Sequence, residues 1–526
     1  MIYLDYAATA PIDETVFEAM LPYLKPDGLH GNPASTHGPG FKARAAVDAA
    51  RQQVAGLIGA EAGEIIWTSG ATESNNLAIK GALEFRGFPK NGKPAHIVTS
   101  KTEHKCVLDT CRHLETLGAR VSYLKPDGQG RVTPDAVLAA LTPDTVLVSL
   151  MWVNNEIGTV NDIEQLALRL RERGVMLHVD AAQAAGKLAI DVKAVPVDLL
   201  SLSAHKLYGP KGVGALFVRR KPRARLSPQM HGGGHEQGMR SGTLATHQVV
   251  GMGAACALAS ERFAADVAHW SSLRDTLWSR LRTIPGVLRN GPAEGERAAP
   301  HLLNLSFPGV EGESLRAALG GIAVSSGSAC SSATAEPSYV LRALGRDDET
   351  ANASLRFSFG RGTTRADIEQ VADTVIAQVA RLRAVAVAPE PVMTEIDDSN
   401  PFGYAPEIWR LFRQTPNAGA FPDGTDGVVS AEAGTPAARS VLRLALKFNG
   451  DRIADARFQA YGCPTTIAVG ARLAGWAKGR SSAELARLNA AELREALEIP
   501  EDRAHCALLG EDALRAVLTR YQEQRA

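Results

Sequence analysis

The chain has 526 residues, in which 57 lysine and arginine residues balance 57 aspartate and glutamate residues. This length exceeds one ordinary domain, so we expect several domains with well-buried cores. The balanced charge excludes a global field that would favour nucleic acid or an anionic membrane. The amino terminus, MIYLDYAATAPID, has neither a basic segment nor an apolar run, and no apolar stretch reaches membrane-spanning length. The sequence therefore predicts a cytoplasmic protein without nucleic-acid or membrane partners.

Short β-branched runs alternate with helical patterns between about residues 60 and 220. The runs are EIIWTSG, HIVTSK, RVSYLK, TVLVSLMWV, VMLHVDAAQ, VDLLSLSAHK and GALFVRR. Runs of this kind, separated by helical segments such as IEQLALRLRERG, predict an α/β fold with a mainly parallel sheet covered by helices. We expect the active edge where these strands end.

The rest of the chain divides at changes of pattern. After a long helical segment, the runs HLLNLSF, GIAVSSGSAC and ASLRFSFG predict a smaller α+β domain. The stretch AVAVAPEPVMTEIDDSNPFG is rich in proline and acids and predicts a linker. Beyond it, VLRLALKFNGDRIADARFQAYG predicts a strand pair with Asn449 and Gly450 at its turn, followed by helices. The expected divisions are a unit over 1–385 with a large domain at about 13–260 and a small domain at about 260–385, a linker over 386–402, and a module over 403–526.

Two motifs at strand ends could hold an aldehyde cofactor that carries a phosphate group. Lys206 of SLSAHKLYGPKG could form a Schiff base with an aldehyde cofactor, while Ser203 and His205 meet its phosphate. In HVDAAQ, Asp180 could pair with a protonated pyridine nitrogen, and the Gln183 amide could bond the phenolic oxygen of the ring. The alternative for Asp180 is a helix cap, a common role of aspartate after a strand.

Two further motifs place polar groups near predicted strand ends. Gly70, Ala71 and Thr72 of TSGATESNN open a predicted helix, where free N–H groups attract an anion; the alternative is an ordinary helix entry. His104 of SKTEHK could stack on a ring or move protons, although a lone histidine is more often structural.

Arg356 of SLRFSFGRGTT could bind a substrate carboxylate with two parallel hydrogen bonds, assisted by Asn32 and Asn155. Considered alone, Arg356 would more simply form a surface ion pair.

One of the six cysteines has an unusual setting. Cys330 lies in SSGSACSS among small polar residues, whereas an unreactive cysteine usually packs among apolar side chains. A reactive thiol and a chance surface cysteine are the alternatives. The chain has no CxxC pair, so a disulfide framework or zinc ribbon is not expected. We expect Cys106, Cys111 and Cys256 to pack in cores.

Together these motifs resemble the cysteine desulfurases of the housekeeping iron–sulfur assembly class, which are pyridoxal phosphate enzymes of the aspartate-aminotransferase fold. The resemblance runs from YLDYAATAP to LRFSFGRGTT and includes GNPAST, VNNEIGTV and MHGGGHEQGMRSGTLATHQ. It implies that Lys206 is the Schiff-base residue and that Thr243 reaches the phosphate of a partner subunit, so we expect a homodimer. The implied cofactor contacts are Ala71, Thr72, Asn155, Asp180, Gln183, Ser203, His205, Lys206 and Thr243.

The resemblance also implies a reaction, the conversion of L-cysteine to L-alanine. Lys206 would move the Cα proton, and the Cys330 thiolate would take the sulfur as a persulfide. Because a free cysteine is mostly protonated at neutral pH, His104 is the candidate for an activating base. The sulfur would pass to acceptor proteins, including iron–sulfur scaffolds, and tRNA thiolation is a further destination. The alternatives are a selenocysteine lyase and a catalytically silent assembly hub.

Residues 403–526 resemble the iron–sulfur cluster scaffold proteins that receive sulfur from such enzymes. The scaffolds present three cysteines, an aspartate and a histidine; Cys463, His505 and Cys506 match, whereas Ala438 and Ser440 replace the first cysteine and the aspartate. Three interpretations stay open. The module is a docking or regulatory domain, a sulfur acceptor at Cys463 or Cys506, or an iron–sulfur or zinc site in which Cys330 adds a fourth ligand to Cys463, His505 and Cys506.

Overall fold

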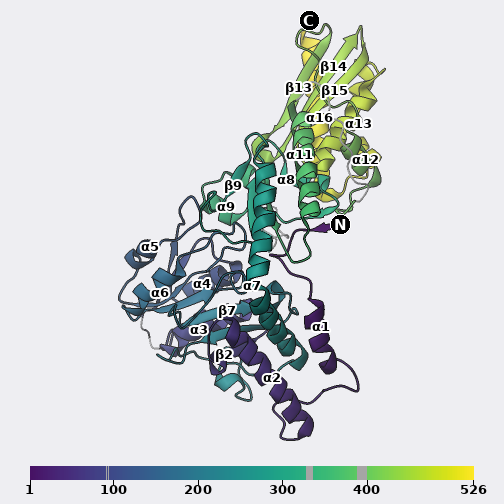
Figure 1. Ribbon diagram of the computed structural model, residues 1–526. Coiled ribbons are helices and arrows are strands. Elements are labelled where there is room, and N and C mark those ends of the chain that lie inside the picture. Colours follow the sequence, from purple (N-terminus) through teal and green to yellow (C-terminus); the bar gives the residue numbers. More distant parts are fainter. Residues whose placement is uncertain (91, 93, 327–335, 388–399, 526) are drawn as a thin grey trace.

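The computed structural model describes residues 1–525 except 91, 93, 327–335 and 388–399. Cys330 and most of the expected linker therefore lie outside the described residues. The molecule is elongated, with a large sheet at one end and the last module, coloured green to yellow, at the other (Figure 1). No described helix is long and apolar enough to cross a membrane.

The large sheet has seven strands, in the spatial order β2-β8-β7-β6-β5-β3-β4. Neighbouring strands pair in parallel from β4 through β3, β5 and β6 to β7, whereas β8 is antiparallel to both of its neighbours, β7 and β2. The predicted mainly parallel sheet is confirmed, and every predicted run contributes one strand. The strands are β2 (Ile65–Thr68), β3 (His96–Ser100), β4 (Arg120–Leu124), β5 (Thr145–Ser149), β6 (Met176–Asp180), β7 (Leu199–Ser203) and β8 (Gly214–Val218).

Helices cover both faces of this sheet because its strands are apolar on both sides. Adjacent strand residues enter different cores: Ile97 packs with α3 and α4, whereas Val98 packs with α2, α6 and α7. Cys111 and Cys256 are fully buried in these two cores, as predicted. The helices of this part are α1 (Glu14–Met20), α2 (Gly38–Leu57), α3 (Ala71–Phe85), α4 (Lys105–Thr116), α5 (Pro134–Ala139), α6 (Ile163–Arg171) and α7 (Thr246–Leu281).

A smaller α+β part follows, and α7 runs into it past residue 260 without a break. Its antiparallel sheet has the order β12-β10-β9, and β1 pairs in parallel with β11, so the amino terminus joins this part (Figure 1). Its strands are β1 (Ile2–Tyr3), β9 (Leu288–Asn290), β10 (Leu302–Ser306), β11 (Ile322–Ala323) and β12 (Ser354–Ser358). Its helices are α8 (Gly312–Ala318), α9 (Tyr339–Ala343), α10 (Asp348–Asn352) and α11 (Arg365–Val387).

The last module has a three-stranded antiparallel sheet. The predicted hairpin is confirmed: Asn449 pairs with Arg452, and Gly450 takes a positive φ of 64° in the loop. The strands are β13 (Val428–Thr435), β14 (Ser440–Asn449) and β15 (Arg452–Tyr461). The helices are α12 (Pro406–Gln414), α13 (Pro464–Ala477), α14 (Ser482–Leu485), α15 (Ala490–Leu497) and α16 (Ala504–Glu523).

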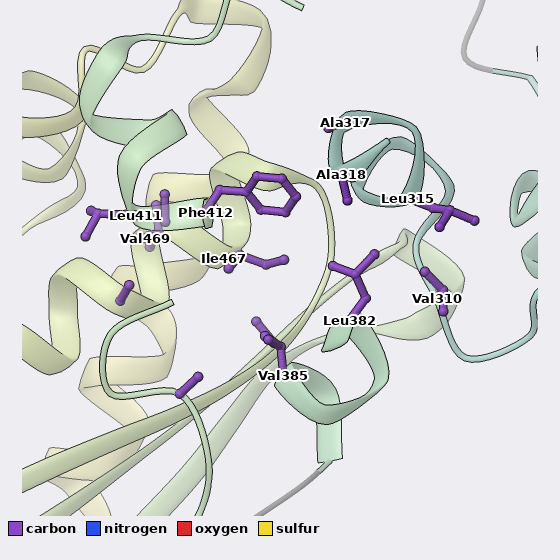
Figure 2. Packing of buried hydrophobic residues seen from close by; sticks show 14 of the residues in the cluster. Val310, Leu315, Ala317, Ala318, Leu382, Val385, Leu411, Phe412, Ile467 and Val469 are labelled. Atoms are coloured by element: carbon purple, nitrogen blue, oxygen red, sulfur yellow. The ribbon is translucent and has the colours of Figure 1, made fainter. Parts of the chain in front are cut away.

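The last module and the small domain share one hydrophobic core. Figure 2 shows Leu382 of α11 and Ala318 of α8 on one side, with Phe412 of α12 and Ile467 of α13 on the other. Burial of apolar surface on both sides stabilises this arrangement. The module is therefore docked on the small domain of its own chain.

Polar contacts fix the orientation of the docked module. Ser314 Oγ in α8 donates to the carbonyl oxygen of Gly462 at 2.6 Å, and Arg503 Nη2 lies 2.5 Å from Glu313 Oε1. Arg381 Nη1 donates to the carbonyl oxygen of Phe412 at 3.1 Å. Burial lowers the pKa of this guanidinium to about 10.

Candidate active site

A cavity of about 550 Å³ opens beyond the carboxyl ends of β3, β6 and β7. In open α/β sheets, ligands bind at this edge. Asn32 and Thr243 are exposed and do not line the cavity, and Cys330 lies outside the described residues. The cavity brings together the other residues predicted for the enzyme site, namely Ala71, Thr72, His104, Asn155, Asp180, Gln183, Ser203, His205, Lys206 and Arg356.

Lys206 ends a single turn of 3₁₀ helix (Ala204–Lys206) that follows β7. Its Nζ donates to the carbonyl oxygens of Ala7 and Ala8, each at 2.6 Å. The amino-terminal segment thus holds the amine at the cavity wall. A second lysine lies close by, because the buried Lys187 donates from Nζ to the carbonyl oxygen of Lys206 at 3.1 Å. Burial, with a further effect of the Lys206 charge, lowers the pKa of Lys187 to about 7.

Asp180 ends β6, beside β7 in the sheet. Its Oδ2 accepts from Asn75 Nδ2 at 2.8 Å, and its Oδ1 accepts from the backbone N–H of Ala182 at 2.9 Å. These two donors hold the carboxylate in one orientation beside the cavity. Gln183 is held as well, because its Nε2 donates to the carbonyl oxygen of Ala7 at 2.8 Å and its Oε1 lies 3.1 Å from His301 Nε2.

The amino terminus of α3 forms one wall of the cavity. Its N-cap is Gly70, so no side chain satisfies the first N–H groups of the helix. Gly70 has a φ of 153°, and a Cβ there would meet no atom within 4 Å, so the space beside the helix end is open. His205 lies nearby with its Nδ1 3.2 Å from Thr9 Oγ1, and burial, reinforced by the Lys206 charge, lowers its pKa to about 4. The open helix end suits a phosphate group.

His104 caps α4 and contacts a cysteine. Its Nδ1 accepts from the backbone N–H of Cys106 at 3.2 Å and lies 3.0 Å from Cys106 Sγ. Asn75 Nδ2, which also bonds Asp180, lies 3.1 Å from the same sulfur. Cys106 is half-buried and packs against the core beside α3 and α4, as predicted, and it also lines the cavity, which was not predicted.

Arg356 is buried in β12 with a side-chain exposure of 3%, so it forms no surface ion pair. Its Nη2 lies 2.7 Å from Asp5 Oδ1, and its Nη1 donates to the carbonyl oxygen of Asn155 at 2.8 Å. Arg356 Nε and Asn155 Oδ1 are buried and have no hydrogen-bond partner among the described residues. Both side chains line the cavity and remain able to bond a polar ligand.

These features fit pyridoxal phosphate. The open end of α3 suits the phosphate, the oriented Asp180 carboxylate suits the pyridine nitrogen, and Lys206 suits the aldehyde. The buried groups without partners on Asn155 and Arg356 suit the polar groups of an amino acid bound beside it.

Asn75, Lys187 and His301 contact the site residues and were not predicted from the sequence. Asn75 could have been found, since it lies four residues after Ala71 on the same helix and so faces the same side. Lys187 and His301 carried no comparable signal because their contacts depend on the packing of distant segments.

In the last module, Cys463 Sγ lies 3.7 Å from Cys506 Sγ, and Cys506 Sγ lies 3.4 Å from His505 Nε2. The hydrogen bond from the Cys506 thiol lowers the pKa of Cys463. The described part of the chain holds no group of three or more His, Cys, Asp or Glu side chains that could bind a metal ion. The predicted set of Cys330, Cys463, His505 and Cys506 includes one residue outside that part and stays a prediction.

Comparisons with known proteins match both parts of the chain. The model of the aminotransferase class-V family matches residues 2–371, and that of the NifU-like N terminal domain matches residues 403–526. The cysteine desulfurase IscS of Colwellia psychrerythraea is 56% identical over 383 residues, which are 73% of this chain and 93% of that protein. IscS of Pseudomonas aeruginosa is 56% identical over 386 residues, covering 73% and 94%.

Solved structures share the fold. A NifS-like protein superposes with a TM-score of 0.66 at 33% identity, covering 72% of this chain and 99% of that one. DndA from Streptomyces lividans superposes with a TM-score of 0.57 at 38% identity, covering 68% and 99%.

Proposed function

The chain belongs to the cysteine desulfurases of the class-V aminotransferase family, and from this membership we propose how its own residues share the reaction. It is a pyridoxal phosphate enzyme that acts on L-cysteine and supplies sulfur for iron–sulfur cluster assembly, with a NifU-like domain at its carboxyl end. When bound, pyridoxal phosphate supplies an aldehyde that captures an amine and a ring that takes up electrons. The observation that carries the residue assignment is the single cavity that gathers the predicted side chains.

Each residue takes a role that its contacts support. Lys206 holds the cofactor and moves the proton at the Cα of L-cysteine, because its amine is fixed at the cavity wall. Arg356 binds the substrate carboxylate, with Asn155 beside it. His104 acts on the thiol protons as a base, because its side chain lines the cavity. Cys330 takes the sulfur as a persulfide.

We expect Asp180→Asn to lower kcat for alanine formation by about 10²-fold, because the neutral amide no longer offers a charge beside the ring nitrogen. The asparagine keeps the shape of the side chain but has a single accepting oxygen, so it also keeps only one of the two hydrogen bonds from Asn75 and the N–H of Ala182. Alanine formation at saturating cofactor and L-cysteine measures it. Asp191→Asn, at an exposed aspartate outside the cavity, is the control, and an unchanged kcat in Asp180→Asn would contradict the assignment.

The active site is completed in a homodimer, in which Thr243 bonds the phosphate of the partner subunit. Thr243 is exposed and lies outside the cavity of its own chain. Arg240, three residues earlier, pairs with Glu73 in the first turn of α3, with 2.8 Å between Nε and Oε1. This segment therefore lies beside the open end of α3.

Mixing two weakened variants tests this arrangement. We expect Thr243→Ala to weaken cofactor binding by about tenfold, since one hydrogen bond to a charged group is lost. In a mixed dimer with Lys206→Ala, one site would receive both an intact Lys206 and an intact Thr243. Mixing and reassembling the subunits should therefore restore activity at limiting cofactor. If Thr243 served its own chain, mixing would restore nothing beyond the separate activities.

The NifU-like domain acts as a docked module that does not build a complete cluster by itself. Its core is continuous with that of the small domain, and Ala438 and Ser440 stand where the scaffolds have two ligands. The surface formed by α8 and α11 is covered by the chain's own module, so a separate scaffold protein would have to displace it.

Phe412→Ala tests the docking. Phe412 is fully buried at the junction, and its loss should lower the free energy of unfolding by about 3–5 kcal/mol through a cavity in the shared core. Urea unfolding of the intact chain measures the change. Phe402→Ala, at a phenylalanine that is 47% exposed, is the matched control and should change the free energy by less than about 0.5 kcal/mol. Equal effects of the two changes would contradict the placement of Phe412 in the shared core.

A further inference from the structure

A pair of thiols lies outside the cavity, in the docked module. Cys463 precedes the first turn of α13 and is half-buried, whereas Cys506 lies in the first turn of α16 and is fully buried. Their sulfur atoms are 3.7 Å apart, and both cysteines are free thiols. A disulfide needs a sulfur separation of about 2.05 Å, so a small side-chain movement would join them. The structure thus holds a reduced dithiol ready to close.

The surroundings of the pair do not suit a complete cluster. Ala438 has no donor atom, and the Ser440 hydroxyl is engaged at 3.0 Å by Thr466 Oγ1. The same Thr466 hydroxyl lies 3.4 Å from Cys506 Sγ and 3.6 Å from Cys463 Sγ. Each of the two thiols therefore contacts the other, and His505 Nε2 lies 3.4 Å from Cys506 Sγ. Two thiols in contact can be oxidised to a disulfide after a small movement of their side chains.

The docking holds these thiols against the small domain. Gly462, directly before Cys463, accepts the 2.6 Å hydrogen bond from Ser314 in α8. Arg503, three residues before Cys506, pairs with Glu313 of the same helix. Both thiols are thus anchored to the domain whose sequence carries Cys330, and Cys463 is the more accessible of the two.

We propose that Cys463 and Cys506 form a dithiol that reduces the sulfane sulfur of a persulfide and releases it as sulfide. The inference rests on the proposed persulfide of Cys330. The half-buried Cys463 first attacks the outer sulfur, which moves to Cys463 while Cys330 leaves as a thiol. The buried Cys506 then attacks Cys463 Sγ, which forms the Cys463–Cys506 disulfide and expels hydrosulfide.

Atoms and electrons balance in this sequence. One persulfide and two thiols give one thiol, one disulfide and one H₂S. The sulfane sulfur gains two electrons, and the two cysteines lose them. An external thiol reductant, either a small thiol or a dithiol protein, must then reduce the disulfide before the next cycle. The product is sulfide, the oxidation state that iron–sulfur clusters contain.

A single-turnover experiment on the intact holoenzyme tests this. The reduced protein receives one equivalent of L-cysteine under anaerobic conditions without added thiol, and alanine, sulfide and cysteine linkages are measured per chain. The variants are Cys463→Ser and Cys506→Ser, and the control is Cys111→Ala, which removes a buried thiol from another core. Bound cofactor absorbance and alanine formation report that each variant is folded.

We expect roughly one alanine and one sulfide per chain in the parent and the control, together with a Cys463–Cys506 disulfide identified by peptide mass. Both serine variants should form alanine normally and release at least about tenfold less sulfide, with the sulfur retained as persulfide. Alanine in the parent without sulfide and without the disulfide would overturn the dithiol and leave the desulfurase assignment intact.

A second arm separates the dithiol from the role of Cys330. The Cys330→Ser variant receives inorganic polysulfide in place of L-cysteine. Sulfide release with formation of the Cys463–Cys506 disulfide is expected there, even if the persulfide of Cys330 proves wrong. Failure of the disulfide to form in this arm would overturn the dithiol, whatever the desulfurase result.

Discussion

Replacing Lys206 with alanine is expected to lower kcat for alanine formation from L-cysteine by at least about 10³-fold, because the group that moves the Cα proton is removed. The carbonyl oxygens of Ala7 and Ala8 hold this amine at one position. A water molecule that replaced it as the base would not be held in the same orientation. The measurement is alanine formed per chain, with the visible absorbance of the bound cofactor recorded in parallel. The absorbance should change, since the covalent attachment is lost.

The control for this change is Lys193→Ala, which removes an exposed lysine that pairs only loosely with Glu61, at 3.3 Å. It should leave kcat unchanged. Lys187 provides a sharper check, because its buried amine bonds the carbonyl oxygen of Lys206. Turnover that survives in Lys206→Ala and disappears when Lys187→Met is added would assign the proton transfer to Lys187, contrary to the present assignment.

The large sheet could be predicted from the sequence because each strand carries its own signal. Runs such as EIIWTSG and HIVTSK are rich in β-branched residues, have apolar residues on both faces and are ended by polar residues, which is what a strand between two helical layers requires. Parallel strands then place Asp180 and Lys206 at the same edge, so motifs far apart in the sequence meet in one cavity.

Contacts that depend on distant segments could not be predicted. Cys106 has the sequence setting of a core cysteine on an amphipathic helix, and only the packing of α3 beside α4 turns it toward the cavity. Arg356 has the setting of a surface arginine, and Asp5, 351 positions away, makes it a buried partner. The edge strand β13 was not predicted from the sequence, because its residues, VVSAEAGT, are mostly small and mixed in polarity. Its extended conformation depends on pairing with β14.

The core that the last module shares with the small domain could also not be predicted from the sequence. An apolar stripe on α11 or α12 predicts that this face of the helix is buried, but it does not identify the partner, because any apolar surface could cover the stripe equally well. A docked module was one of three interpretations left open, and the continuity of the core supports it over an independently tethered domain. Docking also changes what the module's thiols can do, because Cys463 and Cys506 are fixed beside the domain that carries Cys330.

Replacing Cys330 with serine should reduce sulfide release and alanine turnover by at least about 10³-fold, while the cofactor stays bound through Lys206. A serine hydroxyl is not ionised at neutral pH and is a poor nucleophile toward sulfur, so the sulfur of L-cysteine would have no acceptor.

The measurement is alanine and sulfide per chain together with the visible absorbance, which should match that of the parent. Ser331→Ala is the matched control, since it changes the neighbouring residue of the same segment and leaves the thiol in place. Loss of absorbance in Cys330→Ser would point to a structural role for this cysteine. Full turnover would assign the nucleophile to another thiol, and Cys106, which lines the cavity beside His104, would then be the first to test because no other cysteine of the described residues lines that cavity.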